Sequence, residues 1–231
     1  MPENILITGA GRGIGLEMTA ELLAAGHFVA AISRNKSDKL TALMEKYPDR
    51  IRFTSADVSN EQDVIRAAEE FGKLGISFTI IINNAAVHLD PERTDLLNVD
   101  FSVYLPTVAV NSVGPLIVCK HFLPMLTRPG VITAISSEAG SIGACWRKSE
   151  FAYCMSKAAL NMNMKILQNR VADENIKVLC IHPGWVRTDM GGGDATLSTE
   201  ESASAVLKII LGKQDIKAPM YLDWQGNEME W

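Results

Sequence analysis

A tyrosine and a lysine four residues apart, Tyr153 and Lys157, are the side chains of this sequence best suited to move a proton. A helix expected over 151–172 carries both, and the i, i+4 spacing puts the phenol and the ammonium on one helix face. A tyrosine with a reference pKa of about 10 is a poor acid or base near neutral pH unless a cation stabilises its phenolate. Lys157 is such a cation. Taken alone, the pair favours the simpler interpretation of a core tyrosine beside a solvated lysine.

A glycine-rich turn near the start of the chain could hold a phosphate. It reads TGAGRGIG over 8–15 and follows a short apolar run. Its glycines let the backbone turn sharply and approach a pyrophosphate, while the next helix presents its N-terminal N–H groups to the anion. A flexible loop is the alternative, but the strand before the turn and the helix after it favour a nucleotide site.

The residues after the next strand indicate which nucleotide binds. NAD-selective sites place an acid about 20 residues after the glycines, whereas here the strand ends at Ser33-Arg34-Asn35. Arg34 and Arg12 could bind a 2′-phosphate through charge-assisted hydrogen bonds. The sequence therefore favours NADP(H). Asp38 keeps NAD(H) as the minor alternative, and two solvated arginines are the simplest explanation.

Short apolar runs alternate with segments of helical period along the whole chain. The runs are nearly all apolar rather than alternating, as strands are when helices cover both faces of a parallel sheet. We expect one α/β domain over 1–231, a doubly wound Rossmann-type parallel sheet of about seven strands with helices on both faces. The expected strands are 4–8, 28–33, 51–55, 78–83, 130–136, 177–181 and 220–223. The expected helices are 14–25, closed by Gly26, two that begin at capping boxes 59–62 and 198–201, and the long 106–126 and 151–172.

Composition argues against several other classes of protein. The 22 Lys and Arg against 27 Asp and Glu give a net charge of −5, which argues against a nucleic-acid partner. The four cysteines form no CxxC pair and the four histidines no metal-binding pattern, so we expect no metal. We find no signal sequence and no run of about 18 apolar residues, which predicts a cytoplasmic protein without a membrane segment. The GxSxG and GxxxxGK[ST] patterns of hydrolases and P-loop kinases are also missing.

Over essentially its whole length the chain resembles the classical short-chain dehydrogenase/reductase (SDR) family. The motifs occur in family order and at the ends of expected strands. They are the glycine turn 8–15, Asp57-Val58, Asn83-Asn84-Ala85, Asn111 with Gly114-Pro115, Ser136-Ser137, Tyr153 with Lys157, and Pro183-Gly184 with Thr188.

The resemblance implies roles for four side chains in hydride transfer between a nicotinamide and a carbonyl or alcohol. Tyr153 would donate a proton to the carbonyl or accept one from the alcohol. Lys157 would lower the pKa of Tyr153 and bind the nicotinamide ribose. Ser137, rather than Ser136, would orient the substrate and hydrogen-bond the developing alkoxide. Asn111 would hold a water of a proton relay, although a buried asparagine at a helix kink is the simpler alternative.

The resemblance also implies the cofactor contacts. Thr188 would anchor the nicotinamide and Asp57 would contact the adenine, with a helix-capping role for Asp57 equally consistent. The full set is Gly9, Gly11, Arg12, Gly13, Ile14, Gly15, Ser33, Arg34, Asp57, Val58, Asn84, Ala85, Ala86, Tyr153, Lys157, Pro183, Gly184, Val186 and Thr188.

The chain departs from the family pattern at two places. Ala86 stands where the family commonly has glycine, a change that matters chiefly where φ must be positive. Ser137 precedes Tyr153 by 16 positions instead of the common interval of about 13, which implies extra residues within 141–150. The longer loop, the segment 182–189 and the terminal Trp231 are most similar to the carbonyl-reductase-like branch that contains the sniffer and C-factor proteins.

We expect a substrate pocket between the loops 86–100, 138–152 and 188–200, with 191–198 as a small mobile lid. His88, Trp146, Trp185 and Met190, with Met155, are the candidate substrate contacts, although each could equally be packing. Such a lining suits an aromatic or aliphatic ketone or aldehyde, or a quinone. Family members commonly form dimers or tetramers, so we expect a homo-oligomer through the two long helices. The alternative function is an NADP(H)-binding regulatory or signalling protein with little turnover, which Ala86 and the branch resemblance favour.

Overall fold

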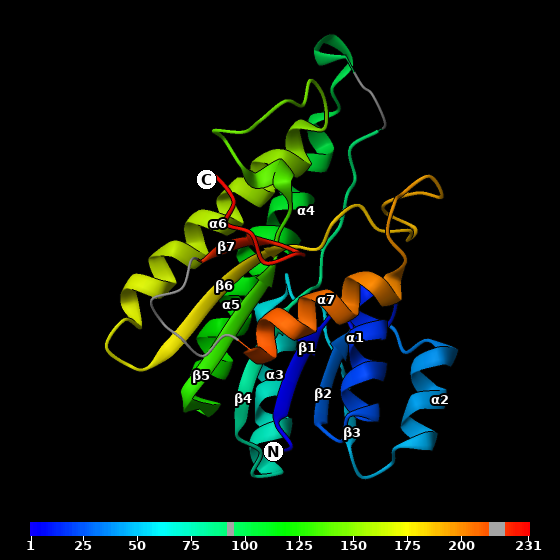
Figure 1. Ribbon diagram of the computed structural model, residues 1–231, viewed down its shortest axis with the longest axis vertical. Coiled ribbons are helices and arrows are strands. Elements are labelled where there is room, and N and C mark those ends of the chain that lie inside the picture. Colours follow the sequence, from blue (N-terminus) through cyan, green and yellow to red (C-terminus); the bar gives the residue numbers. More distant parts are fainter. Residues whose placement is uncertain (92–94, 213–219) are drawn as a thin grey trace.

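The computed structural model describes residues 1–91, 95–212 and 220–231. In this part of the chain, seven parallel strands form one sheet in the order β3-β2-β1-β4-β5-β6-β7 (Figure 1). The order reverses between β1 and β4, which is where doubly wound sheets bind their ligands. The expected fold class is therefore confirmed.

The strands lie close to their expected positions. They are β1 (Asn4–Thr8), β2 (Phe28–Ser33), β3 (Ile51–Ser55), β4 (Phe78–Asn83), β5 (Leu126–Ile135), β6 (Ile176–His182) and β7 (Tyr221–Asp223). β5 begins four residues before the expected start, because Leu126 pairs with Phe78 ahead of a register shift between Phe78 and Ile80.

Six helices of nine or more residues cover the sheet in the described part of the chain. They are α1 (Gly13–Ala24), α2 (Asp38–Lys46), α3 (Glu61–Lys73), α5 (Gly114–Phe122), α6 (Phe151–Arg170) and α7 (Thr199–Gly212). One buried cluster joins the sheet to α3, α5 and α6, and a second joins its other face to α1, α2 and α7. The core thus consists of two apolar layers with the sheet between them.

One of the two expected capping boxes is present. At α7 the Ser198 N–H donates to Glu201, and the Glu201 N–H donates to the Ser198 hydroxyl. At α3 the expectation is wrong. The Ser59 hydroxyl donates to Asp57 at 2.6 Å, and the Asn60 side chain accepts from the Gln62 N–H instead. Asn60 is the N-cap of α3, so Ser59 lies one residue ahead of the capping position.

The expected helix over 106–126 is longer and irregular. The helical stretch Phe101–Met125 contains α4 (Tyr104–Val108), a π-helical segment (Ala109–Val113) and α5, with 3₁₀ turns at both ends. By length and composition alone it could cross a membrane, although only a third of its most apolar window is buried and core helices pass the same test. Here it packs against α6 and α3, and its π-helical segment carries the buried Asn111.

The C-terminal segment folds back onto its own chain. The Trp231 ring lies 5.2 Å from the ring of Tyr221 on β7, and the Trp231 carbonyl accepts a hydrogen bond from the Gly143 N–H. The last residue therefore contacts the inserted loop that follows Ser137, on the side of the sheet where the strands end.

Candidate active site

Tyr153 lies in the first turn of α6, where residues of the loop after β4 fix it. Asp90 accepts hydrogen bonds from the backbone N–H groups of Ala152 and Tyr153, both at 2.9 Å. The ring of His88 lies 4.5 Å from the tyrosine ring. The Lys157 ammonium lies 5.7 Å from the same ring, so the expected pairing of phenol and ammonium on one face of α6 is present.

Burial changes the pKa values of both members of this pair. Lys157 is buried and donates to the Ile135 carbonyl at 2.9 Å, and burial lowers its pKa to about 8. Burial raises the pKa of Tyr153 to about 12, against the effect of a hydrogen bond with Ser137. The expected lowering of the tyrosine pKa is therefore not found, because burial of the phenol outweighs the groups that lower its pKa, Ser137 and Arg147. At neutral pH the phenol is protonated and ready to donate.

The structure brings Ser137, and not Ser136, to the tyrosine. The Ser136 hydroxyl donates to Asn161 Oδ1 at 2.6 Å, and this hydrogen bond is buried. Ser137 acts to lower the pKa of the Tyr153 phenol, and its own hydroxyl donates to Glu138 Oε2 at 2.6 Å. The Tyr221 hydroxyl donates to the Ser137 carbonyl at 2.5 Å, which holds the backbone of this serine.

Asn111 stabilises an irregular part of the fold. It lies in the π-helical segment, accepts from the Val87 N–H, and donates to the Val87 carbonyl and to the Ser156 hydroxyl at 2.8 to 3.0 Å. These contacts tie the loop after β4 to α6 beside Lys157. They agree with the helix-kink interpretation, and the water relay stays a prediction.

The glycine turn has the shape that an anion requires. Gly9 has a φ of +70°, and a side chain there would lie 2.7 Å from the Asn84 amide. At Gly13 the nearest atom to a side chain would be Thr188 Cγ2, at 3.5 Å, so the turn faces the segment after β6. In the described part of the chain, the side chain of the N-cap residue of α1 makes no capping hydrogen bond, and the first turn of the helix contains no acid. Its N–H groups are therefore available to a pyrophosphate.

The remaining cofactor candidates lie around this turn. Asn84 donates to the carbonyls of Thr8 and Gly9, so it joins β4 to the glycine turn. Ala86 is not one of the described non-glycine residues with a positive φ, so its methyl group needs no strained backbone. The Gly114 backbone packs closely against Val58. The other cofactor candidates belong to the same strand ends and to the segments that follow them. They are Gly11, Ile14, Gly15, Ala85, Pro183, Gly184 and Val186.

The two arginines expected at the 2′-phosphate each face an acid. Arg12 contacts Asp189 at 3.1 Å, with both side chains largely exposed, and Arg34 lies 3.9 Å from Asp57. The Ser33 hydroxyl donates to the Asn35 carbonyl, and no acid ends β2. Asp57 accepts from the Ser59 N–H at the entrance to α3, which agrees with the helix-end role that the sequence left open.

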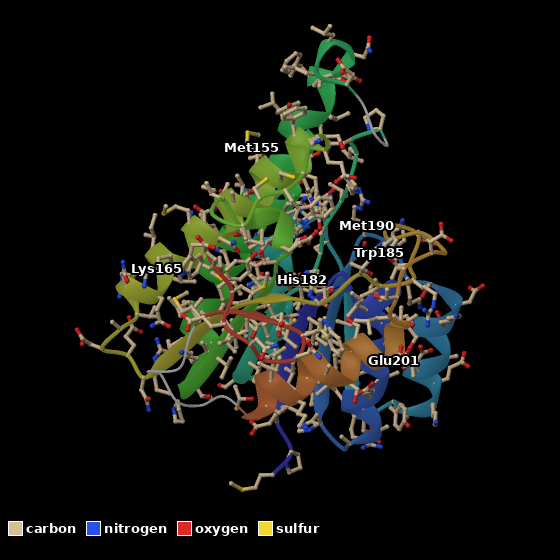
Figure 2. All side chains as sticks on the ribbon, turned by 45° about the horizontal axis from the view of Figure 1, so that its top comes forward. Met155, Lys165, His182, Trp185, Met190 and Glu201 are labelled. Carbon is tan, nitrogen blue, oxygen red and sulfur yellow. The ribbon has the colours of Figure 1, made fainter. Side chains whose placement is uncertain are left out.

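The candidate substrate residues differ in their positions relative to Tyr153. His88 contacts Tyr153, whereas Trp185 and Met190 are exposed together on the segment after β6 (Figure 2). Trp146 is exposed on the inserted loop, with the Arg147 guanidinium 5.3 Å from its ring. Met155 is exposed two residues after Tyr153, and that spacing puts it on the other side of α6. It therefore lies away from the site, against expectation.

The expected lid is tied to the segment before it. Trp185 Nε1 donates to the Gly191 carbonyl, and Arg187 Nη1 donates to the carbonyls of Ala195 and Thr196. Residues 191–198 thus form a compact loop beside the glycine turn. Its mobility stays a prediction.

Sequence analysis missed an ionic cluster beside Ser137. Arg147 on the inserted loop contacts both Glu138 and Glu150, and His182 Nδ1 lies 3.6 Å from Glu138. The extra loop length was visible in the sequence, but the partner that its arginine would reach was not. Among the described residues, no group of histidine, cysteine, aspartate or glutamate side chains could hold a metal ion.

Comparison with known proteins agrees with this arrangement. The family profile described as short chain dehydrogenase matches residues 3–196. The chain belongs to the short-chain dehydrogenase/reductase family. The C-signal protein of Myxococcus xanthus is 36% identical over 154 residues, which are 66% of this chain and 92% of that protein.

Solved structures of other SDR proteins match over the full chain. A putative short-chain dehydrogenase/reductase from Burkholderia multivorans with bound NADP has a TM-score of 0.92 at 32% identity, covering 100% of both chains. The NADPH-bound carbonyl reductase from chicken fatty liver has a TM-score of 0.90 at 29% identity, covering 100% of this chain and 99% of its own. The carbonyl reductase Sniffer of D. melanogaster has a TM-score of 0.89 at 25% identity over both whole chains. The SDR resemblance, including the branch that contains sniffer and C-factor, is thus confirmed.

Proposed function

We propose that this SDR protein is an NADP(H)-dependent carbonyl reductase that acts on small neutral aldehydes, ketones or quinones. The observation that carries the proposal is the meeting of Tyr153, Ser137 and Lys157 at the edge of the sheet where the glycine turn also lies. A phenol, a hydroxyl and an ammonium at one point suit the protonation of a carbonyl oxygen while its carbon accepts a hydride.

The chain's own residues supply the proton and the orientation. The neutral phenol of Tyr153 donates to the carbonyl oxygen, and in the reverse direction accepts from the alcohol. Lys157, held by the Ile135 carbonyl, lies close enough to stabilise the phenolate left behind and to bind the ribose. When bound, the nicotinamide supplies or accepts the hydride.

Two observations support a preference for NADP(H) over NAD(H). Arg12 and Arg34 stand at the glycine turn and at the end of β2, where a 2′-phosphate would lie, and no acid ends that strand. The structural relatives from Burkholderia multivorans and chicken fatty liver carry NADP and NADPH.

The side chains around Tyr153 support a neutral substrate with an apolar part. His88 covers one side of the phenol, and Trp185 and Met190 offer apolar surface on the segment after β6. The charge of Arg147 is matched by Glu138 and Glu150, so this arginine does not favour an anionic substrate.

The test is NADPH oxidation at 340 nm by the purified protein against aldehydes, ketones and quinones, with Tyr153→Phe as the control. We expect carbonyl-dependent oxidation that falls at least about 100-fold in the variant, while NADPH binding, measured by fluorescence, stays. Similarity to the C-signal protein favours a second candidate, a cofactor-binding signalling protein. Tight NADPH binding without turnover of any carbonyl would support that candidate and contradict the reductase.

A further inference from the structure

Ser137 lies just beyond the support of the sheet. The ladder between β5 and β6 ends with the pair Ile135 and Ile181, and the Ser136 N–H still donates to the Ile181 carbonyl at 2.8 Å. Ser137 itself is the N-cap residue of the 3₁₀ turn Glu138–Gly140, where the chain leaves the strand. The direction of its hydroxyl therefore depends on how its own backbone is held.

The hydroxyl of Tyr221 on β7 holds that backbone. It donates to the Ser137 carbonyl at 2.5 Å, and the hydrogen bond is buried. The Gly140 N–H donates to the same carbonyl at 2.9 Å, so one oxygen joins the 3₁₀ turn to a strand residue 84 positions further along the chain. Because Tyr221 is only 1% exposed, water does not compete for this hydrogen bond.

The segment after β7 holds Tyr221 in turn. It runs back along β7, with the Met229 N–H donating to the Tyr221 carbonyl at 2.9 Å (Figure 1). The Trp231 ring lies 5.2 Å from the Tyr221 ring, and the Trp231 carbonyl accepts from the Gly143 N–H on the inserted loop. One segment therefore fixes both the tyrosine and the loop that follows Ser137.

We propose that Tyr221 is a positioning residue for the reaction: its hydroxyl holds the backbone of Ser137, so that the serine hydroxyl stays where the substrate carbonyl binds. Trp231 supports the tyrosine ring. A displacement of about 1 Å at a group that orients the substrate can cost about 100-fold in rate, so the hold on this backbone matters. The inference rests on the proposed reductase function and adds to it a residue outside the catalytic motifs.

The contact is tested without turnover, by hydrogen exchange and mass spectrometry. Tyr221→Phe keeps the ring and removes only the hydroxyl, so the amides of 137–143 should exchange at least about 5-fold faster. The matched control is Tyr47→Phe, which removes a hydroxyl at the end of α2 and should leave these amides unchanged. Trp231→Ala, at a residue that is 42% exposed, should also speed the exchange, and it serves as the second variant if Tyr221→Phe does not fold. Unchanged exchange in the folded variant would overturn the proposal.

The consequence for catalysis is tested with NADPH and 4-nitrobenzaldehyde. Tyr221→Phe should lower kcat/KM for the aldehyde about 5-fold to 10-fold, because Ser137 is less well placed for the carbonyl. The KM for NADPH should stay unchanged, since three strands separate β7 from β1, which the glycine turn follows. Tyr47→Phe should keep the wild-type kcat/KM. An unchanged kcat/KM in Tyr221→Phe would overturn the positioning role.

A double-mutant cycle distinguishes positioning from a general loss of stability. Tyr221→Phe should cost nothing further in a Ser137→Ala background, because the tyrosine acts only through the hydroxyl of that serine. Equal losses in both backgrounds would mean that Tyr221 supports the fold alone and would overturn the proposal. Wild-type protein without turnover of any carbonyl would instead overturn the reductase function, and the positioning role with it.

Discussion

Asp90 accepts a hydrogen bond from the backbone N–H of Tyr153, so the loop after β4 fixes the helix turn that carries the phenol. The same carboxylate accepts from Ala152, and it is therefore the N-terminal cap of α6. An acid at this end also interacts favourably with the helix dipole. The loop that borders the expected substrate pocket is thus joined directly to Tyr153, the proposed proton donor.

Replacing this cap should affect stability and activity together. We expect Asp90→Ala to lower the free energy of unfolding by about 1 kcal/mol, which is about 2 to 4 °C in Tm, and kcat by about 10-fold. Calorimetry and the NADPH assay measure the two effects. Ser37→Ala is the matched control, because Ser37 caps α2 away from Tyr153. It should show the loss of stability with unchanged kcat. Equal kcat in both variants would mean that the cap does not position the phenol.

Arg12 should discriminate between the two nicotinamide cofactors. We expect Arg12→Ala to weaken NADPH binding about 10-fold or more and NADH binding hardly at all, because only NADPH has the 2′-phosphate. Asp189→Asn should tighten NADPH binding, since it removes the acid that contacts Arg12 in this structure. Fluorescence titration gives the dissociation constants, with Arg52→Ala on β3 as the control. Equal losses for both cofactors would place Arg12 elsewhere than at the 2′-phosphate.

The sequence predicts the fold because its signals are local. Continuous apolar runs, a glycine turn and capping residues each act over a few positions, and six of the seven strands lie within about one residue of expectation. The sequence did not predict the early start of β5, and it raised a helix irregularity at Asn111 only as an alternative. Both depend on contacts with other segments, Phe78 for the strand and Val87 for the asparagine.

The site is predicted only in part, for the same physical reason. Motif spacing brings Tyr153, Lys157 and Ser137 together, but the pKa of Tyr153 depends on burial, which no short motif encodes. Glu138 directly follows a predicted residue, yet its ion-pair partner Arg147 lies nine residues later on an irregular loop. Met155 was misplaced because its side chain lies on the outer face of α6.

Lys157 should make stability rise with pH. Its pKa is about 8 in the folded protein and about 10.4 in the unfolded chain, so above pH 8 the unfolded chain binds more protons. Lys157 should therefore add roughly 1 kcal/mol to the free energy of unfolding between pH 7 and pH 9. The buried thiols of Cys119 and Cys180 act in the opposite direction from about pH 8.5, because burial raises their pKa values to about 12 and they lose protons only when unfolded. The contribution of Lys157 is therefore the difference in pH dependence between wild type and Lys157→Met in urea titrations. An equal pH dependence in the two proteins would contradict the prediction.

The outer face of α6 should hold a second copy of the chain. Met155, Met162 and Ile166 are exposed at spacings of seven and four, which is one helix face, and Val113 and Leu116 are exposed at the start of α5. We expect light scattering to give at least the mass of a dimer, and Met162→Glu with Ile166→Glu to lower it to that of one chain. Lys208→Glu is the control, because it reverses the charge of an exposed residue on α7, which covers the other face of the sheet. It should leave the mass unchanged, and a wild-type monomer would contradict the expectation.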